Sequence, residues 1–196
     1  MTMIKTSYFA TPYLLDLVDI DTKPLIDYAY NLKQTSQGRQ STNLNSWQSF
    51  DLDKNESTLQ DLLKVFTNKC QIMHEDMKLK NKFKQIIDNI WFNINPRGGG
   101  NKPHVHSDTI FSGVLYLKCN NNSGNLVFPH PAANHVYHFN DDTIEEHNHM
   151  NSSFFRTPPQ EKKLIIFPSY ANHYVEPNNS DSDRISLSFN TKFIEQ

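Results

Sequence analysis

Cysteine is scarce in this chain of 196 residues, and long apolar runs are missing from it. Its two cysteines, Cys70 and Cys119, cannot build a disulfide framework and form no CxxC pair, although a single bridge between them is compatible with the count. No segment approaches the roughly 20 apolar residues that a membrane-spanning helix needs. The first residues also lack an apolar run followed by a small-residue cleavage site, so we expect no signal peptide and a cytoplasmic location, in a bacterium or a phage-infected host cell.

A marked excess of one charge is also missing. The formal net charge is -2, which gives no bulk electrostatic reason to expect a nucleic acid or a membrane surface as the partner. Arginine occurs only at positions 39, 97, 156 and 184, so each arginine is a candidate for a specific role.

The first part of the chain has helical periodicity. Residues 22–35 carry apolar side chains at helical spacing behind Thr22 as a cap and Pro24 in the first turn. Residues 56–77 carry a longer apolar stripe, which predicts an amphipathic helix. The polar segment 36–55 between them is expected to be a loop.

After about residue 86 the periodicity changes to two, which is typical of strands. Short apolar runs then alternate with turn residues, at 86–95, 110–118, 124–128, 135–139, 152–156, 163–168 and 184–190. This order predicts a mainly β protein, an antiparallel sandwich or barrel with the N-terminal helices packed on one side. We expect one domain over residues 1–196, with a helical part at 1–85 and the barrel at 86–196.

The stretch "NKPHVHSDTIFSGVLYL" places His104, His106 and Asp108 at alternating positions, so in an extended chain all three face the same way. They are either polar residues on a solvent face or metal ligands. Two imidazoles at i and i+2 can reach one ion, and Asp108 could complete a facial triad of two histidines and one carboxylate. His173, at the end of the apolar run in "LIIFPSYANHYV", offers a third imidazole.

The run "DRISLSFN" puts Arg184 and Ser186 on the same face of a strand, together with Ser188 and Asn190. An arginine inside a sheet needs an anionic partner because an unpaired buried charge is costly. Its guanidinium suits a carboxylate, and that carboxylate belongs either to a bound ligand or to an internal Asp or Glu.

These pieces together resemble the 2-oxoglutarate and Fe(II)-dependent oxygenase superfamily. The match is tightest to one branch, common in tailed phages of marine bacteria and in some bacteria. The stretches that carry the resemblance span most of the chain: "STNLNSWQSFDL", the run from Asn93 to Leu117 with its HxH pair and SGV-x-Y-L, FPS-x-x-x-H-x-V-x-PN from Phe167, and RIS-x-SFN from Arg184. Two departures are Ser107, where the branch commonly has proline, and "PHPAANHVYHF" at 129–139, where it commonly has a segment like Asp-Pro-Arg.

The resemblance implies a double-stranded β-helix, a jelly-roll or cupin-like barrel, that binds Fe(II) and uses 2-oxoglutarate and O2. It implies His104, His106 and His173 as the metal ligands and catalytic centre, with Asp108 as the alternative ligand. Arg184 and Ser186 match the family's anchor for 2-oxoglutarate, and Tyr116, on the SGV-x-Y-L strand, is a candidate for a further contact with it.

The resemblance also implies a reaction, hydroxylation of a small molecule or a protein side chain with release of succinate and CO2. The alternatives are a cupin-like metal enzyme without 2-oxoglutarate, and a silent barrel that acts as an interaction protein. Among the other histidines, His74 is expected on the surface, and His147 and His149 in a solvated loop. His130, His135 and His138 are candidates to touch substrate.

Overall fold

The computed structural model describes residues 10–132 and 141–195. Of the sequence predictions, the run at 135–139 with His135 and His138 lies outside the described residues. None of the described helices is both long and apolar enough to cross a membrane.

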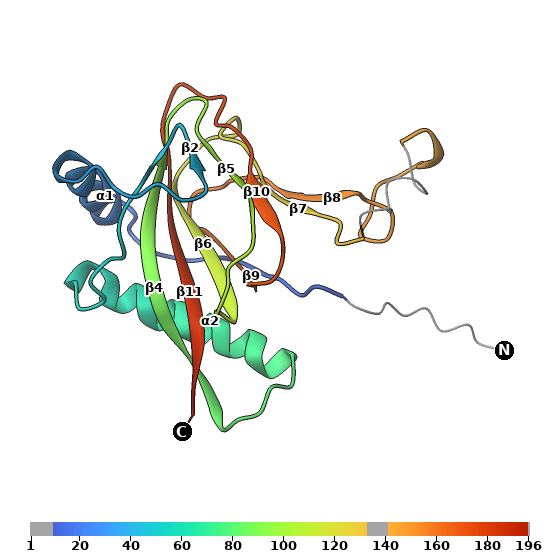
Figure 1. Cartoon of the computed structure of the whole chain (residues 1–196), viewed down its shortest axis with the longest axis horizontal. Helices are drawn as coiled ribbons and strands as arrows, with labels where there is room; N and C mark the ends of the chain where they lie inside the picture. Colours follow the sequence, from blue (N-terminus) through green and yellow to red (C-terminus); the bar gives the residue numbers. More distant parts are fainter. Residues whose placement is uncertain (1–9, 133–140, 196) are drawn as a thin grey trace.

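The described residues form eleven strands and two α-helices (Figure 1). The helices are α1 (Lys23–Thr35) and α2 (Gln60–Asp76), with 3-10 turns at Ser57–Leu59 and Asp141–Thr143. The strands are β1 (Leu14–Leu17), β2 (Asn43–Leu44), β3 (Trp47–Gln48), β4 (Phe83–Asn95), β5 (Gly100–His104), β6 (Phe111–Lys118), β7 (Leu126–Pro129), β8 (Phe154–Thr157), β9 (Lys163–Pro168), β10 (His173–Val175) and β11 (Arg184–Glu195). Both predicted helices are confirmed.

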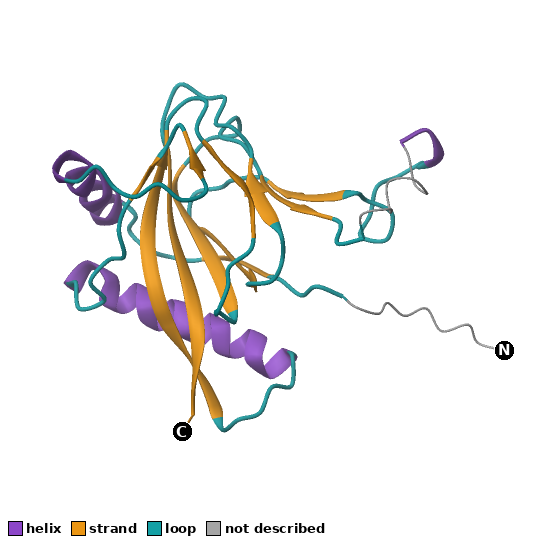
Figure 2. Ribbon diagram, viewed as in Figure 1, coloured by secondary structure: helices purple, strands orange, loops and turns teal. Residues whose placement is uncertain are grey.

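The strands form two antiparallel sheets. The larger sheet has the order β1-β9-β6-β11-β4-β3, and the smaller has the order β2-β5-β10-β7-β8. Together they make a sandwich of the double-stranded β-helix kind, and α2 runs across the long strands of the larger sheet (Figure 2). The predicted fold class is confirmed.

Alternation along β4 and β11 divides the larger sheet into two chemically different faces. On β4, Ile90, Phe92 and Ile94 are fully buried, and Phe66 of α2 stacks on Phe189 of β11 with ring centroids 4.2 Å apart. The residues between them on each strand point to the opposite face, toward the smaller sheet. The face under the helices therefore holds the main core, and the other face is free to carry polar side chains.

The segment expected to be a loop, 36–55, contains β2 and β3, so that expectation was wrong in part. Trp47 is buried and pairs with Ile94 at the edge of the larger sheet, while Asn43 pairs with Asn101 at the edge of the smaller one. Strands of two residues leave no periodic pattern in a sequence. The part before residue 86 therefore contains both helices, the three short strands β1 to β3 and the first residues of β4.

The expectation that His74 lies on the surface was also wrong. Its side chain is fully buried on α2, with its ring edge-on to Phe193. His74 follows Cys70 by one helical turn, so both side chains lie on the apolar stripe that faces the sheet.

Replacing Gln85 by leucine is expected to stabilise the protein. Gln85 is fully buried beside this core, and neither its amide oxygen nor its amide nitrogen finds a hydrogen-bond partner among the described residues. A buried polar group without a partner costs about 1–3 kcal/mol, so Gln85→Leu should raise the free energy of unfolding by about 1 kcal/mol or more. Urea titration measures it, with Gln34→Leu on the exposed face of α1 as the control. A lower midpoint for Gln85→Leu alone would contradict the prediction.

Candidate metal centre and active site

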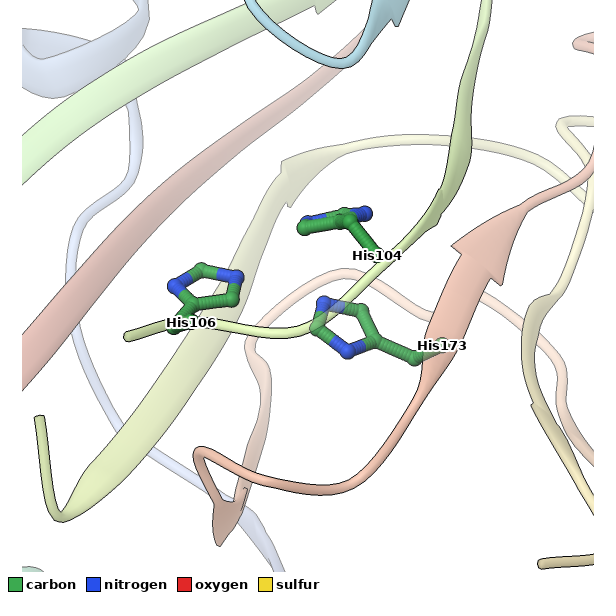
Figure 3. A group of neighbouring side chains, drawn as sticks. All are labelled: His104, His106 and His173. Atoms are coloured by element: carbon green, nitrogen blue, oxygen red, sulfur yellow. The ribbon is translucent and has the colours of Figure 1, made fainter. Parts of the chain in front are cut away.

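Three histidines converge between the two sheets. His104 ends β5, His106 follows two residues later, and His173 begins β10, directly across the ladder from His104. One ring nitrogen from each lies within 4.8 Å of the others, and the rings of His104 and His173 have centroids 4.2 Å apart. Figure 3 shows the three rings gathered around one point. This spacing allows all three to bind one metal ion.

The hydrogen bonds of the rings determine which nitrogen is available. Each Nδ1 faces a protein oxygen that accepts its hydrogen: Lys102 O at 2.7 Å from His104, Asn190 Oδ1 at 2.7 Å from His106, and Ala171 O at 2.9 Å from His173. The lone pair then lies on Nε2, as is usual for metal-binding histidines held by a second group. His106 Nε2 is buried without a hydrogen-bond partner among the described residues, which fits a metal ligand.

Burial keeps the three rings neutral. Loss of solvent lowers the pKa of His106 to about 4 and that of His173 to about 3, and it also lowers the pKa of His104. The neighbouring rings add to the effect because each charge would repel the next. Near neutral pH, protons therefore do not compete with a metal ion for these nitrogens.

Acidification of the metal-free protein is expected to lower its stability. The pKa values of His106 and His173 lie near 4 and 3 in the fold but near 6.5 in an unfolded chain. Between these values the unfolded chain binds more protons, so the free energy of unfolding falls as the pH decreases from about 7 to about 5. Urea titrations along this range measure the slope. A His173→Phe variant should show a shallower slope, and an equal slope would contradict the assignment.

Asp108 does not join this cluster. It is exposed on the turn after His106, with a backbone φ of 58°, and it is not among the residues that line the cavity beside the histidines. Of the two ligand sets left open by the sequence, the structure brings together the three imidazoles and leaves the carboxylate outside.

A polar cavity of about 440 Å³ lies beside the histidines, between the two sheets. Its wall on the larger sheet is the face of β4, β6 and β11 that points away from the helices. The predicted stripe of Arg184, Ser186, Ser188 and Asn190 lines it, as the alternation of β11 requires. The candidate metal ligands and the candidate carboxylate anchor therefore open into the same space.

Arg184 is the largest fully buried side chain and is only 1% exposed. Its Nη1 donates hydrogen bonds to the carbonyl oxygens of Ser123, Gly124 and Glu176. Its Nη2 is buried and finds no hydrogen-bond partner, and no carboxylate forms an ion pair with Arg184, among the described residues. The guanidinium is thus fixed on one side and free to bind an anion on the other.

Ser186 and Tyr116 are the other two predicted contacts for the co-substrate. They face each other across the β11–β6 ladder, and both are buried and line the cavity. Burial raises the pKa of Tyr116 to about 12, so its phenol stays protonated and can donate a hydrogen bond. Arg184, Ser186 and Tyr116 form one polar end of the cavity.

Comparison with known proteins decides the family. The family described as "Putative 2OG-Fe(II) oxygenase" matches residues 89–190, more than half of the chain. The protein belongs to this family. It is a 2OG-Fe(II) oxygenase, which implies Fe(II) and 2-oxoglutarate as its cofactor and co-substrate. The histidine cluster fits the first of these, and Arg184 Nη2, which has no hydrogen-bond partner among the described residues, fits the second.

Solved structures share the fold of this oxygenase. A prolyl-4-hydroxylase of Pseudomonas putida is 14% identical with a TM-score of 0.63, over 92% of this chain and 91% of that one. The viral collagen prolyl hydroxylase of Paramecium bursaria Chlorella virus-1, in complex with 2OG, is 14% identical with a TM-score of 0.59, over 91% and 94% of the two chains. HygX of Streptomyces hygroscopicus, with nickel and 2-oxoglutarate bound, is 7% identical with a TM-score of 0.59, over 92% and 82%. A search of curated protein sequences finds no match.

Several residues around the oxygenase site were not singled out by the sequence. Trp91 lies against His106, with ring centroids 6.0 Å apart. The guanidinium carbon of Arg39 lies over the ring of Trp91, 5.4 Å from its centroid. Arg39 also forms an ion pair with Asp51 at 3.0 Å. Because arginine is scarce in this chain, Arg39 was a candidate for a specific role. Its place beside the site was not predicted, because the segment 36–55 was expected to be a loop. His147 and His149 are exposed, as expected.

Proposed function

We propose that His104, His106 and His173 hold the Fe(II) of this oxygenase, and that Arg184 pairs with the distal carboxylate of 2-oxoglutarate. The geometry of the cluster and the hydrogen bonds of its Nδ1 atoms, which leave the lone pairs on Nε2, support the metal role. The observation that carries the proposal is the buried Nη2 of Arg184, which has no hydrogen-bond partner in the described part of the chain and belongs to a residue of the cavity that the three histidines also line. A cupin-like enzyme without 2-oxoglutarate has no need for such a group.

When bound, Fe(II) would activate O2 together with 2-oxoglutarate: one oxygen atom would enter the succinate that forms as CO2 is released, and the other would enter an unreactive C–H bond of the substrate as a hydroxyl group. The chain orients these groups. Ser186 and Tyr116 place two hydroxyl groups beside the guanidinium of Arg184, so that the carboxylate can be held by a charge and by neutral donors together. The two sheets exclude bulk water from that end of the cavity.

We further propose that the chain forms one catalytic domain that belongs to the branch common in marine tailed phages and some bacteria and works in the cytoplasm. The motifs from Ser41 to Asn190 and the low cysteine count support this. Its substrate is a small molecule or a protein side chain rather than a nucleic acid, since the formal net charge of -2 offers no attraction to phosphates.

Anaerobic addition of Fe(II) and 2-oxoglutarate to the purified protein tests the proposal. We expect a visible metal-to-ligand charge-transfer band, followed by slow release of succinate when O2 is admitted without substrate. Bound iron without the band would favour a metal enzyme that does not use 2-oxoglutarate. A protein that binds no iron would overturn the assignment of the three histidines.

Replacing Asp108 by asparagine is expected to leave Fe(II) affinity within about twofold of wild type, because the carboxylate is exposed and outside the cluster. Anaerobic titration calorimetry measures the affinity. A loss comparable to that expected from removing a direct ligand would show that Asp108 moves to bind the metal.

A further inference from the structure

The amide of Asn190 connects one histidine of the cluster to the larger sheet. Its Oδ1 lies 2.7 Å from His106 Nδ1 and 2.7 Å from Ser112 Oγ. Ser112 Oγ lies in turn 3.1 Å from Ser169 Oγ. The four side chains come from β11, β6 and the segments that follow β5 and β9. A chain of hydrogen bonds thus runs from the sheet to a candidate metal ligand.

The direction of these hydrogen bonds follows from the chemistry of the groups. The Ser112 hydroxyl donates to the Asn190 oxygen, so the Ser112 oxygen is left to accept from the Ser169 hydroxyl. With its oxygen toward Ser112, the Asn190 amide also presents that oxygen to His106 and accepts the Nδ1 hydrogen. The opposite amide orientation would present an NH2 group to Nδ1, move the ring hydrogen to Nε2 and remove the lone pair that binds metal.

His106 differs in this respect from the other two histidines. His104 and His173 donate to backbone carbonyl oxygens, which can only accept. His106 depends on a side-chain amide, which can accept or donate according to its orientation. Asn190 is 6% exposed, and it lies between Asn89 of β4 and Ser112 of β6, directly before an irregularity in the β11–β4 ladder.

We propose that Asn190 is a positioning residue that selects the metal-binding tautomer of His106, and that Ser112 and Ser169 hold its amide in the required orientation. This inference rests on the metal role proposed above for the histidines. Asn190 acts through His106 and does so before any metal binds, so its effect is measurable in the metal-free protein.

Two measurements on four proteins test the inference: wild type, Asn190→Ala, Asn190→Asp and Asn89→Ala. Nitrogen-15 NMR of the metal-free proteins at one fixed pH reports which ring nitrogen of His106 carries hydrogen. Titration with Co(II) reports metal affinity. Asn89→Ala is the matched control, since Asn89 is the cross-strand neighbour of Asn190 and lines the same cavity, and its Oδ1 has no hydrogen-bond partner among the described residues.

We expect wild type, Asn190→Asp and Asn89→Ala to keep the hydrogen on Nδ1, because aspartate can accept the same hydrogen bond as the amide. Asn190→Ala should give a mixture of tautomers and bind Co(II) about 10- to 100-fold more weakly. Asn190→Asp should bind at least as tightly as wild type.

An unchanged tautomer and affinity in Asn190→Ala would overturn the inference. So would an Asn190→Asp protein as weak as Asn190→Ala, because the loss would then come from packing. If Asn190→Ala does not fold, Ser112→Ala frees the amide and should shift the tautomer in the same direction by a smaller amount; no shift overturns the inference. A wild type with the expected tautomer but no Co(II) binding would instead refute the metal role.

Discussion

Replacing His173 by alanine is expected to weaken Fe(II) binding by at least about 100-fold, since loss of a direct ligand should exceed the 10- to 100-fold cost of losing a group that only supports one. His173 is 5% exposed and contributes one of three ring nitrogens that lie within 4.8 Å of one another. Two imidazoles would remain, which is too few to hold a divalent iron against water. Anaerobic calorimetry measures the affinity, and the charge-transfer band with 2-oxoglutarate should disappear with it.

The matched control is His149→Ala, which removes an exposed histidine far along the chain from the cluster. It should bind Fe(II) as wild type does. If His173→Ala kept most of the affinity, the metal would have to be held by a set that does not include β10.

Replacing Arg184 by leucine is expected to weaken the binding of 2-oxoglutarate without weakening the binding of Fe(II). Fe(II) should still bind, because Arg184 is not part of the histidine cluster, but the dissociation constant of 2-oxoglutarate should rise by about 100-fold or more. The reason is that the distal carboxylate of 2-oxoglutarate would lose the buried guanidinium proposed to pair with it. The intensity of the charge-transfer band against 2-oxoglutarate concentration measures this constant.

Arg184→Lys is the companion variant, since it keeps the charge and loses the planar pair of donors. It should fall between wild type and Arg184→Leu. Retained Fe(II) affinity in both variants shows that the protein is folded despite the loss of the hydrogen bonds to the carbonyl oxygens of Ser123 and Gly124. A wild-type dissociation constant for 2-oxoglutarate in Arg184→Leu would remove Arg184 from the anchor.

The sequence predicted most of the fold, and it predicted which candidate site residues share one face of a strand, because both follow from the alternation of side chains along strands. The polar stripe of β11 from Arg184 to Asn190 has a period of two, and so does the apolar stripe that faces α2. The choice between Asp108 and a third histidine could not be made from spacing, because it depends on the turn after His106. That turn carries Asp108 away from the cluster, and a positive φ is not encoded in any pattern of side chains.

Contacts that depend on tertiary structure were also beyond the sequence. Arg39 and Trp91 are 52 positions apart, and their approach depends on β3, a strand of two residues at the edge of β4. His74 was misplaced for a related reason. Its position on the helix fitted the buried stripe, but histidine is more often found on a surface.

The position of β11 between β4 and β6 makes two parts of the proposed site depend on the register of a single strand. Arg184 is its first residue and Asn190 lies six residues later, so one strand carries the proposed co-substrate anchor and the proposed support of a candidate metal ligand. Insertion or deletion of one residue within β11 would turn every later side chain to the opposite face. Such a change would exchange Ser188 and Asn190 for apolar neighbours in the cavity, and the chain would lose its packing and its chemistry together. Length variation among functional variants is therefore expected in the loops and not in this strand.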